Sequence, residues 1–422
     1  MLDLQDRLDE LKGLGLYRRM RMVSGPQGPR VVLDGTPVLL LCSNNYLGLA
    51  DHPRVREAAA DAAMRWGAGT GASRLVSGNM TLHRRLEERL AAFKGTQSAV
   101  LFGSGYLANL GVIPALARRG EIVFADELNH ASTSDGCRLA GAEVFAYRHG
   151  DVEHLAWGLR NADGRGALIA TDGVFSMDGD VAPLEEIVEL ARRHDVRVMV
   201  DDAHGDGTLG PGGRGTIADA GLDGEVDVIV GTLGKAFGSY GAYVACDDPM
   251  ARYLVNSART LMFSTGLPPA AVAAAMAALE LLAEQPRRVE RLADNAAALR
   301  DELAREGFDV SGPETQIVPL IVGDAGLALR ICEAALEQGV FAQAIRPPAV
   351  PEGTSRLRLA VMASHTKEEL RDAARILARA ALRNGLRPSV TLPVAATQSG
   401  PRPAAARGVF DADADGGLAR AA

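Results

Sequence analysis

The sequence has few cysteines, and their spacing builds neither a metal site nor a disulfide framework. The four cysteines are Cys42, Cys137, Cys246 and Cys332, and no Cys-x-x-Cys pair occurs. So few thiols in a chain of 422 residues are typical of a reducing compartment. We therefore predict a cytoplasmic protein that holds no metal.

The sequence also lacks long hydrophobic runs and any surplus of basic charge. Its first eleven residues alternate charges and leucines at helical spacing, which argues against a signal peptide or membrane span and predicts a docking helix. The net charge of −8 and the pI near 5.6 disfavour a nucleic-acid footprint. We expect neither nucleic acid nor a membrane as a partner, and we expect individual arginines to bind acidic substrates.

Seven short β-branched runs alternate with longer helical patterns. This alternation predicts an α/β fold with a mostly parallel sheet and helices on both faces. The runs are residues 98–102, 122–125, 143–147, 167–171, 196–200, 226–230 and 242–245. Polar residues follow several of these runs, and ligands of such sheets bind at the carboxyl ends of the strands. We expect the chemistry to collect there.

The pattern predicts four parts along the chain. Residues 1–48 form an N-terminal helix and arm, 49–285 a large domain, and 286–386 a smaller C-terminal α/β domain. A long helical stretch from about 269 to 307 leads into that domain, whose predicted strands are 315–322, 340–344 and 355–359. Residues 387–422 are rich in Ala, Pro, Gly and Arg, a composition that cannot repay ordering entropy and predicts disorder.

Residues 226–241 lead from an apolar run into a glycine-rich loop that carries Lys235. A partly buried lysine shifts its pKa readily, which suits it to Schiff-base chemistry and to covalent binding of pyridoxal 5'-phosphate (PLP). A nucleotide P-loop is disfavoured because Ile229 replaces its first glycine and Ala236 replaces the hydroxyl that would hold magnesium. A surface lysine in a turn stays open on this segment alone.

The run 196–200 ends in Asp201-Asp202-Ala203-His204. A carboxylate at this position could pair with the pyridinium nitrogen of PLP, while the histidine reaches the phenolic oxygen of the ring. The alternative is a turn in which Asp202 or His204 caps a helix. The Asp-x-x-His spacing, followed 31 residues later by Lys235, favours the cofactor interpretation.

Glycines after the run 98–102 predict an anion site at a helix N-terminus, formed by Gly105 and Tyr106. A tight turn is the alternative. A dinucleotide fingerprint, whose ribose-binding acid would be Glu121 or Asp126, fits poorly because the glycines do not make G-x-G-x-x-G.

Two further segments end at the same predicted edge. His130 follows the run 122–125 and could lie face to face with a bound aromatic ring, although a capping or solvated histidine is the commoner outcome. Residues 171–179 bring the Ser176 hydroxyl towards the same place, unless they form a plain Gly/Asp turn.

Taken together, five segments resemble the α-oxoamine synthases. They are residues 44–48, 129–132, 173–179, 201–205 and 231–235. Members of this family are PLP enzymes with the aspartate aminotransferase fold (fold type I), and they condense an amino acid with an acyl-CoA and release CO2. The resemblance runs from about residue 16 to residue 383 and implies the same fold and reaction class.

The resemblance implies the roles of the cofactor residues. Lys235 matches the lysine that binds PLP covalently, Asp201 the pyridinium partner, His204 the phenolate contact and His130 the ring-stacking histidine. The remaining contacts of the cofactor fall on Ser176, on the phosphate-binding Thr232, and on Gly105 and Tyr106. Ser264 and Thr265 resemble a loop that family members lend to the phosphate site of a neighbouring subunit, which implies a homodimer with shared active sites.

Residues 344–351 are similar to the subgroup that joins L-alanine to a pimeloyl thioester, CoA-bound or carrier-bound, and gives 8-amino-7-oxononanoate in biotin biosynthesis. Ala349 stands where that subgroup commonly has threonine. Glycine acetyltransferases and 5-aminolevulinate synthases usually carry an aromatic residue where Arg346 and Pro347 stand. The alternative is another α-oxoamine synthase, of one of these two types or of the serine palmitoyltransferase type, that uses a different amino acid and acyl-CoA.

The resemblance also implies substrate contacts. Arg358 matches the arginine that holds the amino-acid carboxylate, a task that suits a guanidinium fork. Asn44 matches an asparagine at the edge of the active site, and Arg18 an arginine near the acyl substrate. Arg346 and His130 complete the predicted substrate contacts, whereas Arg356 is assigned to the solvated surface. A non-enzymatic PLP-binding protein would keep Lys235 but would not need Arg358.

Overall fold

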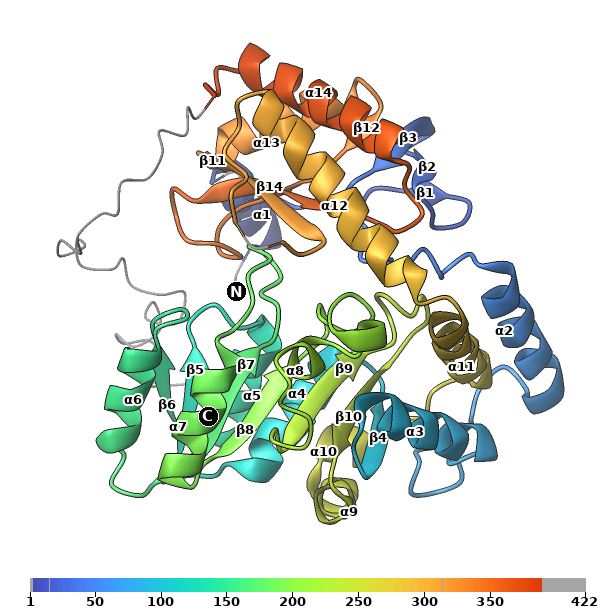
Figure 1. Cartoon of the computed structure of the whole chain (residues 1–422), viewed down its shortest axis with the longest axis vertical. Coiled ribbons are helices and arrows are strands. Elements are labelled where there is room, and N and C mark those ends of the chain that lie inside the picture. Colours follow the sequence, from blue (N-terminus) through green and yellow to red (C-terminus); the bar gives the residue numbers. More distant parts are fainter. Residues whose placement is uncertain (1–2, 15, 313, 389–422) are drawn as a thin grey trace.

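The computed structural model describes residues 3–14, 16–312 and 314–388, which form two α/β units. Figure 1 shows the smaller unit above the larger one, with the long helix α12 (Arg287–Arg305) running along the smaller unit. The predicted disordered tail lies, from residue 389 onward, outside the described residues.

The large unit is built on a seven-stranded sheet. In spatial order its strands are β4 (Ser98–Phe102), β10 (Ala242–Cys246), β9 (Val228–Thr232), β8 (Arg197–Asp201), β7 (Gly166–Asp172), β5 (Ile122–Asp126) and β6 (Glu143–Tyr147). Strand β10 is antiparallel to both of its neighbours, and β9, β8, β7, β5 and β6 pair in parallel. The prediction of a mostly parallel sheet is therefore confirmed, with strand ends that differ from the predicted runs by at most two residues.

Helices cover both faces of this sheet, so its central strands are buried on both sides. One apolar cluster joins the sheet to α4 (Gly105–Leu116), α5 (Ala131–Ala140), α9 (Asp248–Ser257) and α10 (Arg259–Met262). The opposite cluster includes α3 (Thr81–Lys94), α6 (Val152–Arg160), α7 (Leu184–His194) and α11 (Pro269–Glu284), and α2 (Pro53–Trp66) packs on α11. Burial on two faces explains why strands such as β9 carry continuous rather than alternating apolar residues.

The helical stretch predicted from 269 to 307 is two helices rather than one. Helix α11 ends at Glu284 and α12 begins at Arg287. Pro286 forces the residue before it out of the helical region, and Gln285 accordingly adopts φ −129° and ψ 59°. The break lets the chain pass from the large unit to the small one.

The small unit contains a three-stranded antiparallel sheet in the order β11 (Ile317–Gly323), β14 (Ser355–Ala360) and β13 (Gln343–Ile345). Helices α12 and α13 (Ala325–Leu336) pack against it, and α14 (Lys367–Arg383) packs on these two helices. The predicted run 340–344 is divided between β12 (Val340–Phe341) and β13.

A second small sheet joins the N-terminal arm to this unit. Strands β1 (Val23–Ser24), β2 (Arg30–Leu33) and β3 (Thr36–Leu40) are consecutive antiparallel neighbours, and β3 pairs in parallel with β12. The sequence pattern did not predict these three strands. Their pairing places the segment that follows β3, which includes Asn44, between the two units.

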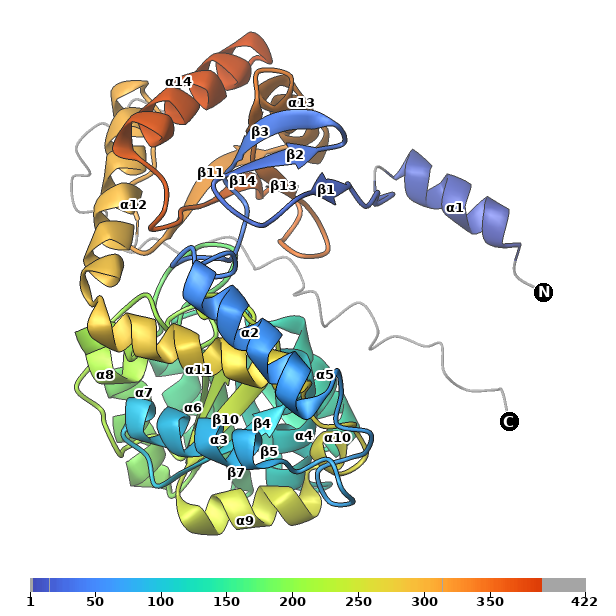
Figure 2. The ribbon, with the colours of Figure 1, turned by 90° about the vertical axis from the view of Figure 1, so that its right-hand side faces the viewer.

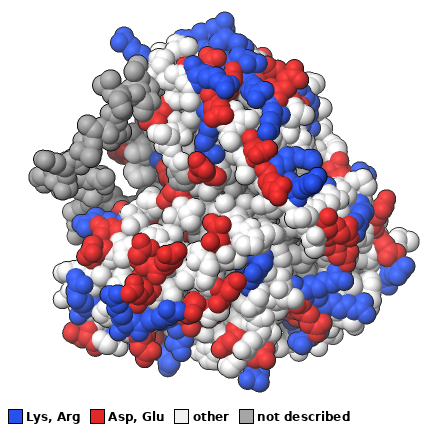
Figure 3. Space-filling model, viewed as in Figure 1, with Lys and Arg blue, Asp and Glu red and all other residues white. Residues whose placement is uncertain are grey.

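The predicted docking helix is present as α1 (Leu4–Gly13), begun by Asp3, whose side chain accepts a hydrogen bond from the Gln5 amide. It has no buried residue, and Figure 2 shows it projecting away from the rest of the chain. Among the described residues no helix has the length and apolarity needed to cross a bilayer. On the face drawn in Figure 3, basic and acidic side chains are interspersed.

Candidate active site

Polar residues gather at the carboxyl ends of β7, β8 and β9. Asp172 and Asp201 are the last residues of neighbouring parallel strands and are paired in register, and Thr232 ends β9. Lys235 follows three residues after Thr232, in the loop that leads to β10. The structure therefore brings the predicted lysine and aspartate to one edge of the sheet, where open α/β sheets bind their ligands.

Lys235 differs from the other three lysines of the chain. Lys12, Lys94 and Lys367 each form ion pairs with carboxylates. Within the described residues Lys235 has no carboxylate at ion-pair distance, and its Nζ lies 2.7 Å from Nε2 of His204. Burial lowers the pKa of Lys235 to about 8, although the field of Asp201 opposes this shift. A sizeable fraction of the amine is therefore neutral, and nucleophilic, near neutral pH.

His204 is held through both its ring and its backbone. Its Nδ1 lies 2.6 Å from the hydroxyl of Tyr46, and its carbonyl accepts a hydrogen bond of 2.8 Å from Gln316 Nε2. Burial, reinforced by the charge of Lys235, depresses the pKa of His204 well below its usual value. The imidazole is therefore neutral at physiological pH, with one ring nitrogen as donor and the other as acceptor.

Asp201 and His130 belong to one hydrogen-bonded network, in which Asp201 is buried and His130 lies at the exposed end. Asn109 Nδ2 donates to Asp201 Oδ2 at 2.7 Å and to Ser132 Oγ at 2.8 Å, and that hydroxyl lies 2.6 Å from His130 Nδ1. Asp201 Oδ1 also accepts from the Ala203 amide at 3.1 Å. The surrounding protein partly desolvates the ring and lowers the pKa of His130, which keeps this imidazole neutral as well. The network fixes both side chains relative to the edge of the sheet.

Asp172 lies beside Asp201 at the ends of the two strands. Burial and the neighbouring Asp201 raise the pKa of Asp172 well above its usual value. One of its oxygens accepts from the His130 amide at 3.3 Å.

The predicted carboxylate-binding arginine reaches the same cluster. Arg358 donates to Asn44 Oδ1 at 3.2 Å and to the Tyr46 hydroxyl at 3.1 Å, and its Nε donates to the carbonyl of Ser176. The three predicted residues Asn44, Ser176 and Arg358 thus meet next to the partner of His204. They come from the segment after β3, the loop after β7 and strand β14.

The assignment of Arg356 to the solvated surface is wrong. The side chain is buried, with the residue 5% exposed, and forms an ion pair with Asp178. It also donates to the Thr354 carbonyl at 3.0 Å. All six residues of β14 are buried, because the loop 173–181 of the large unit packs on this strand, so both of its arginines face protein instead of water.

The predicted phosphate cradle is at the N-terminus of α4. Ser104 caps this helix by accepting from the Leu107 amide at 3.2 Å, and a Cβ added at Gly105 would meet nothing within 4 Å. The Tyr106 hydroxyl donates to Asp135. Thr232 donates to the Gly241 carbonyl at 3.2 Å and accepts from the Gly234 amide at 3.3 Å. The backbone at Gly105 is open, as an anion-binding helix start requires.

The remaining predicted residues lie elsewhere. Ser264 and Thr265 line a small cavity near Gly103, and Thr265 forms a β-bridge with Ser73. None of the contacts of these two residues in the described chain reaches Lys235.

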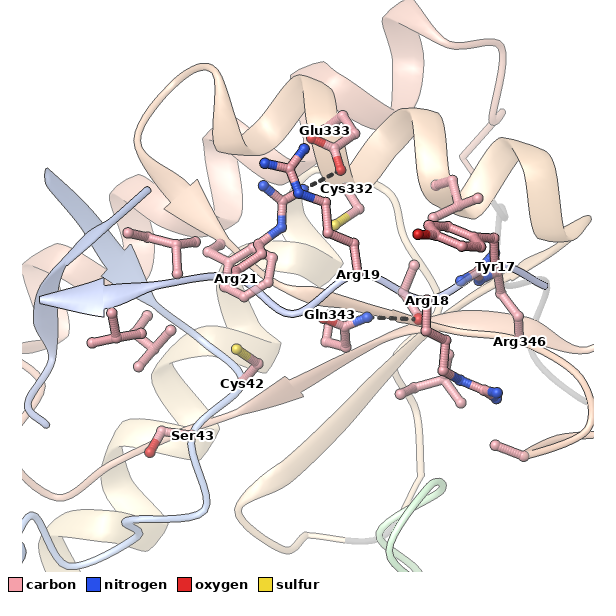
Figure 4. A pocket seen from close by; sticks show the side chains of 18 of the residues that line it. Tyr17, Arg18, Arg19, Arg21, Cys42, Ser43, Cys332, Glu333, Gln343 and Arg346 are labelled. Carbon is pink, nitrogen blue, oxygen red and sulfur yellow. Dashed lines mark hydrogen bonds and ion pairs between the residues drawn. The ribbon is translucent and has the colours of Figure 1, made fainter. Parts of the chain in front are cut away.

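Two larger cavities meet at the loop 346–351. One, of about 640 Å³, is lined by His130 and Ser176 as well as by apolar residues. The other, of about 800 Å³, is lined by Arg18 and Arg346, and Figure 4 shows it enclosed between the N-terminal segment and the small unit. Ala349 lines both. Arg18 and Arg346 therefore share a cavity with each other and not with Lys235.

Sequence reasoning assigned no role to Tyr46, Asn109, Ser132, Asp172 or Gln316. Asn109 carried a usable signal, since it is a polar residue within an otherwise apolar helix and is completely buried. Its Oδ1 has no hydrogen-bond partner among the described residues. Tyr46 and Gln316 gave no local signal, because their partners are distant in sequence.

Comparison with known proteins agrees with this geometry. The sequence matches the family model of class I and II aminotransferases over residues 36–377.

The chain belongs to the class I and II aminotransferase family.

Relatives within this family extend over nearly the whole chain. The sequence is 52% identical to the 8-amino-7-oxononanoate synthase of Citrifermentans bemidjiense over 380 residues, which is 89% of this chain and 97% of the relative. It is 53% identical to the enzyme of the same name from Geobacter metallireducens, over 88% of this chain and 96% of the relative.

Among solved structures, a variant of serine palmitoyltransferase from S. paucimobilis with a bound PLP–myriocin aldimine superimposes with a TM-score of 0.86. It shares 34% identity and covers 91% of this chain and 98% of its own. The predicted resemblance to the α-oxoamine synthases and the predicted aminotransferase-like fold are both confirmed.

Proposed function

We propose that the protein is a PLP-dependent acyltransferase that condenses L-alanine with a pimeloyl thioester, releases CO2 and gives 8-amino-7-oxononanoate for biotin synthesis. The observation that carries the proposal is Lys235, a partly buried amine without a carboxylate partner in the described chain, beside a neutral His204 and at the same sheet edge as Asp201. Identity above 50% to 8-amino-7-oxononanoate synthases over nearly their whole length supports it.

The donor groups at the sheet edge fit PLP. Lys235 offers an amine for the aldehyde, Asp201 a carboxylate for the ring nitrogen, His204 a ring N–H for the phenolic oxygen, and His130 a ring face. The backbone at Gly105 is open for a phosphate, with Tyr106 and Thr232 nearby in the predicted cradle. Ser176 completes the predicted set. When bound, PLP supplies an electron sink that stabilises a carbanion of the amino acid.

The side chains of the site then have separable tasks. Lys235 takes and returns the α-proton of the amino acid at Nζ, for which a pKa of about 8 is suited near neutral pH. Arg358 and Asn44 orient the carboxylate of the amino acid, because a guanidinium fork binds a carboxylate in a fixed plane. His204, neutral and buried, offers a hydrogen bond without adding a positive charge beside the amine.

The two cavities supply room for the acyl thioester. The cavity lined by His130 and Ser176 also contains Leu128, Phe175 and Met177, which suits an acyl chain, and the cavity of Arg18 and Arg346 suits an anionic group. The predicted substrate roles of Arg18 and Arg346 rest on this second cavity.

The test is an assay of the purified protein with PLP, L-alanine and pimeloyl-CoA, read by the mass of the product and by release of CO2. We expect 8-amino-7-oxononanoate. The sibling alternative is tested by replacing L-alanine with glycine or L-serine. Faster turnover of glycine or L-serine than of L-alanine would assign the protein to one of the sibling synthases. The absence of turnover with all three amino acids would contradict the proposal.

A homodimer with shared active sites is part of the proposal. Phe263 is 68% exposed next to Ser264 and Thr265, and Val76 is 79% exposed in the neighbouring loop that Thr265 contacts through Ser73. Large apolar side chains at such exposure favour a partner surface. Sedimentation at twice the chain mass of 44.3 kDa is expected, and an active monomer would contradict it.

A further inference from the structure

A hydrogen-bonded chain of side chains connects Lys235 with Arg358. Lys235 Nζ lies 2.7 Å from His204 Nε2, His204 Nδ1 lies 2.6 Å from the hydroxyl oxygen of Tyr46, and Arg358 donates to that oxygen at 3.1 Å. Asn44 Oδ1 accepts from Tyr46 at 3.0 Å and from Arg358 at 3.2 Å. The amine proposed to move a proton is thus connected to the arginine proposed to bind a carboxylate.

The chain is enclosed by protein. Tyr46 is completely buried, and His204 and Arg358 are nearly so. Burial raises the pKa of Tyr46 and lowers that of His204, so both side chains are neutral at physiological pH. A neutral imidazole carries a single ring N–H, so the direction of the hydrogen bond on one side of the ring sets the direction on the other side.

Two arrangements of hydrogen satisfy this chain. With Lys235 protonated, Nζ donates to His204 Nε2, His204 Nδ1–H donates to Tyr46, and Tyr46 donates to Asn44. In the second arrangement Lys235 is neutral, His204 Nε2–H donates to the lone pair of Nζ, and Tyr46 donates to His204 Nδ1, which leaves Asn44 with Arg358 as its donor. Protonated Lys235 allows only the first arrangement, because an ammonium group cannot accept a hydrogen bond, whereas neutral Lys235 allows both.

The structure assigns to Tyr46 a positioning role: it couples binding of the amino-acid carboxylate at Arg358 to the protonation of Lys235. This inference rests on the proposed function. A carboxylate that takes the guanidinium of Arg358 removes a donor from both Tyr46 and Asn44. These two oxygens are then best satisfied by the first arrangement, in which His204 donates to Tyr46 and Tyr46 donates to Asn44. Carboxylate binding therefore favours the protonated amine.

Other charges act on Lys235 directly. Asp201, Asp172 and Asp206 favour its protonated form and Arg358 disfavours it, while the rings of His204 and His130 are neutral. A bound carboxylate adds its own direct field. The coupling through Tyr46 is therefore the part of the change in Lys235 protonation that is lost when the Tyr46 hydroxyl is removed.

The experiment uses the full chain free of PLP, in which the Lys235–His204 bond is intact, and propionate, a carboxylate that has no amine to react. The pH midpoint of the rate of PLP attachment, read by visible absorption, is measured with and without saturating propionate, in the wild type and in Tyr46→Phe. The direct field of propionate is the same in both proteins, so the difference between their shifts isolates the coupling. We expect the shift in the wild type to exceed that in Tyr46→Phe by about 0.7 pH unit, which is a fivefold coupling.

Tyr147→Phe is the matched control, because Tyr147 is another buried tyrosine and its hydroxyl has no hydrogen-bond partner in the part of the chain that the structure describes. It should respond to propionate as the wild type does. Asn44→Ala removes the acceptor of the Tyr46 hydrogen and should also reduce the shift, which keeps the test decisive if Tyr46→Phe does not fold. In steady state, Tyr46→Phe should lower kcat and leave KM for pimeloyl-CoA unchanged.

The outcomes separate this inference from the proposed function. Equal propionate shifts in the wild type and both variants would overturn the role of Tyr46 and leave the proposed function standing. A wild-type protein without visible PLP absorption would overturn the proposed function itself, and this inference with it.

Discussion

Lys235 is the only one of four lysines in the described chain that has no carboxylate partner. Replacing it with alanine removes the amine that binds PLP and moves the proton. We expect Lys235→Ala to lose the visible absorption that depends on the lysine, and to lower kcat by more than about a thousandfold. Absorption spectroscopy and the product assay measure the two effects.

Lys367→Ala is the control for this prediction, because its side chain is half exposed on α14 and pairs with Asp294. It should match the wild type in both measurements. Retention of the absorption and of turnover by Lys235→Ala would contradict the assignment of the lysine.

The depressed pKa of Lys235 predicts a pH dependence. Attachment of PLP requires the neutral amine, so its rate should rise with pH up to about 8 and then level off, whereas an ordinary lysine, with its pKa of 10.5, would continue to accelerate. Asp201 favours the protonated amine, so Asp201→Asn should move the midpoint to lower pH. Stopped-flow absorption after mixing PLP with PLP-free protein gives the rate. A midpoint near 10 in the wild type would contradict the prediction.

At this scale the sequence predicted the residues whose roles follow from local spacing. Lys235, Asp201 and His204 were found because a strand, a short turn and a fixed order along the chain bring them together. The roles of Tyr46 and Arg356 were not predicted. Tyr46 contacts His204, which is 158 residues away, and Arg356 contacts Asp178, which is 178 residues away. Burial of an arginine depends on such distant partners, and a single sequence carries no local signal for them.

At the scale of elements, a buried ion cluster around Lys94 stabilises the turn that follows β8. Lys94, the last residue of α3, donates to Asp202 at 2.9 Å, to Asp206 at 2.7 Å and to the Arg214 carbonyl at 2.6 Å, and its side chain is 1% exposed. This turn carries Asp201 and His204. The cluster therefore connects a helix end to the positions of two site residues.

Replacing Lys94 with methionine would leave two buried carboxylates without their cation. We expect Lys94→Met to lower the free energy of unfolding by about 3–5 kcal/mol, measured by denaturant unfolding. Lys367→Met, at an exposed ion pair, should change it by less than about 1 kcal/mol. A loss below about 1 kcal/mol in Lys94→Met would show that the cluster does not hold the turn.

Elements with strong local patterns were predicted well. All seven strands of the large sheet were predicted. The central strands are continuously apolar because they are buried on both faces, whereas the edge strand β6 is mostly exposed and was predicted from its β-branched and aromatic residues. The strands β1 to β3 were missed, since they are short and form only by pairing with one another and with β12, some 300 residues further along the chain. The long helix is divided at Pro286 because a proline disfavours the helical conformation of the residue before it. The prediction of one continuous stretch followed the helical pattern and left this effect out.

At the scale of the whole molecule, the exposed helix α1 and the exposed apolar side chains near Ser264 support the proposed homodimer. The cytoplasmic location stays a prediction. If two copies share their sites, subunits with different defects should complement each other. Two inactive variants, Lys235→Ala and the double variant Ser264→Ala with Thr265→Ala, should recover about a quarter of the wild-type activity after mixed refolding, because half of the dimers then contain one intact site.

The separate variants, refolded alone, are the control and should remain inactive. If each site is formed within one chain, the mixture should show no recovery. Activity of the double variant by itself would show that Ser264 and Thr265 do not contribute to the neighbouring site.

The bond between Arg358 and Tyr46 joins residues 312 positions apart, and it has a consequence for biosynthesis. On the ribosome, the strands of the large sheet are complete once Cys246 has emerged, but Tyr46 must wait for strand β14, which is synthesised last of all strands. At about 5–20 residues per second the wait is several seconds or more. During that interval the segment 41–50, of which five residues are later buried and none is exposed, is open to water and to chaperones. A ribosome that stalls between β10 and β14 therefore leaves a folded sheet without a finished site.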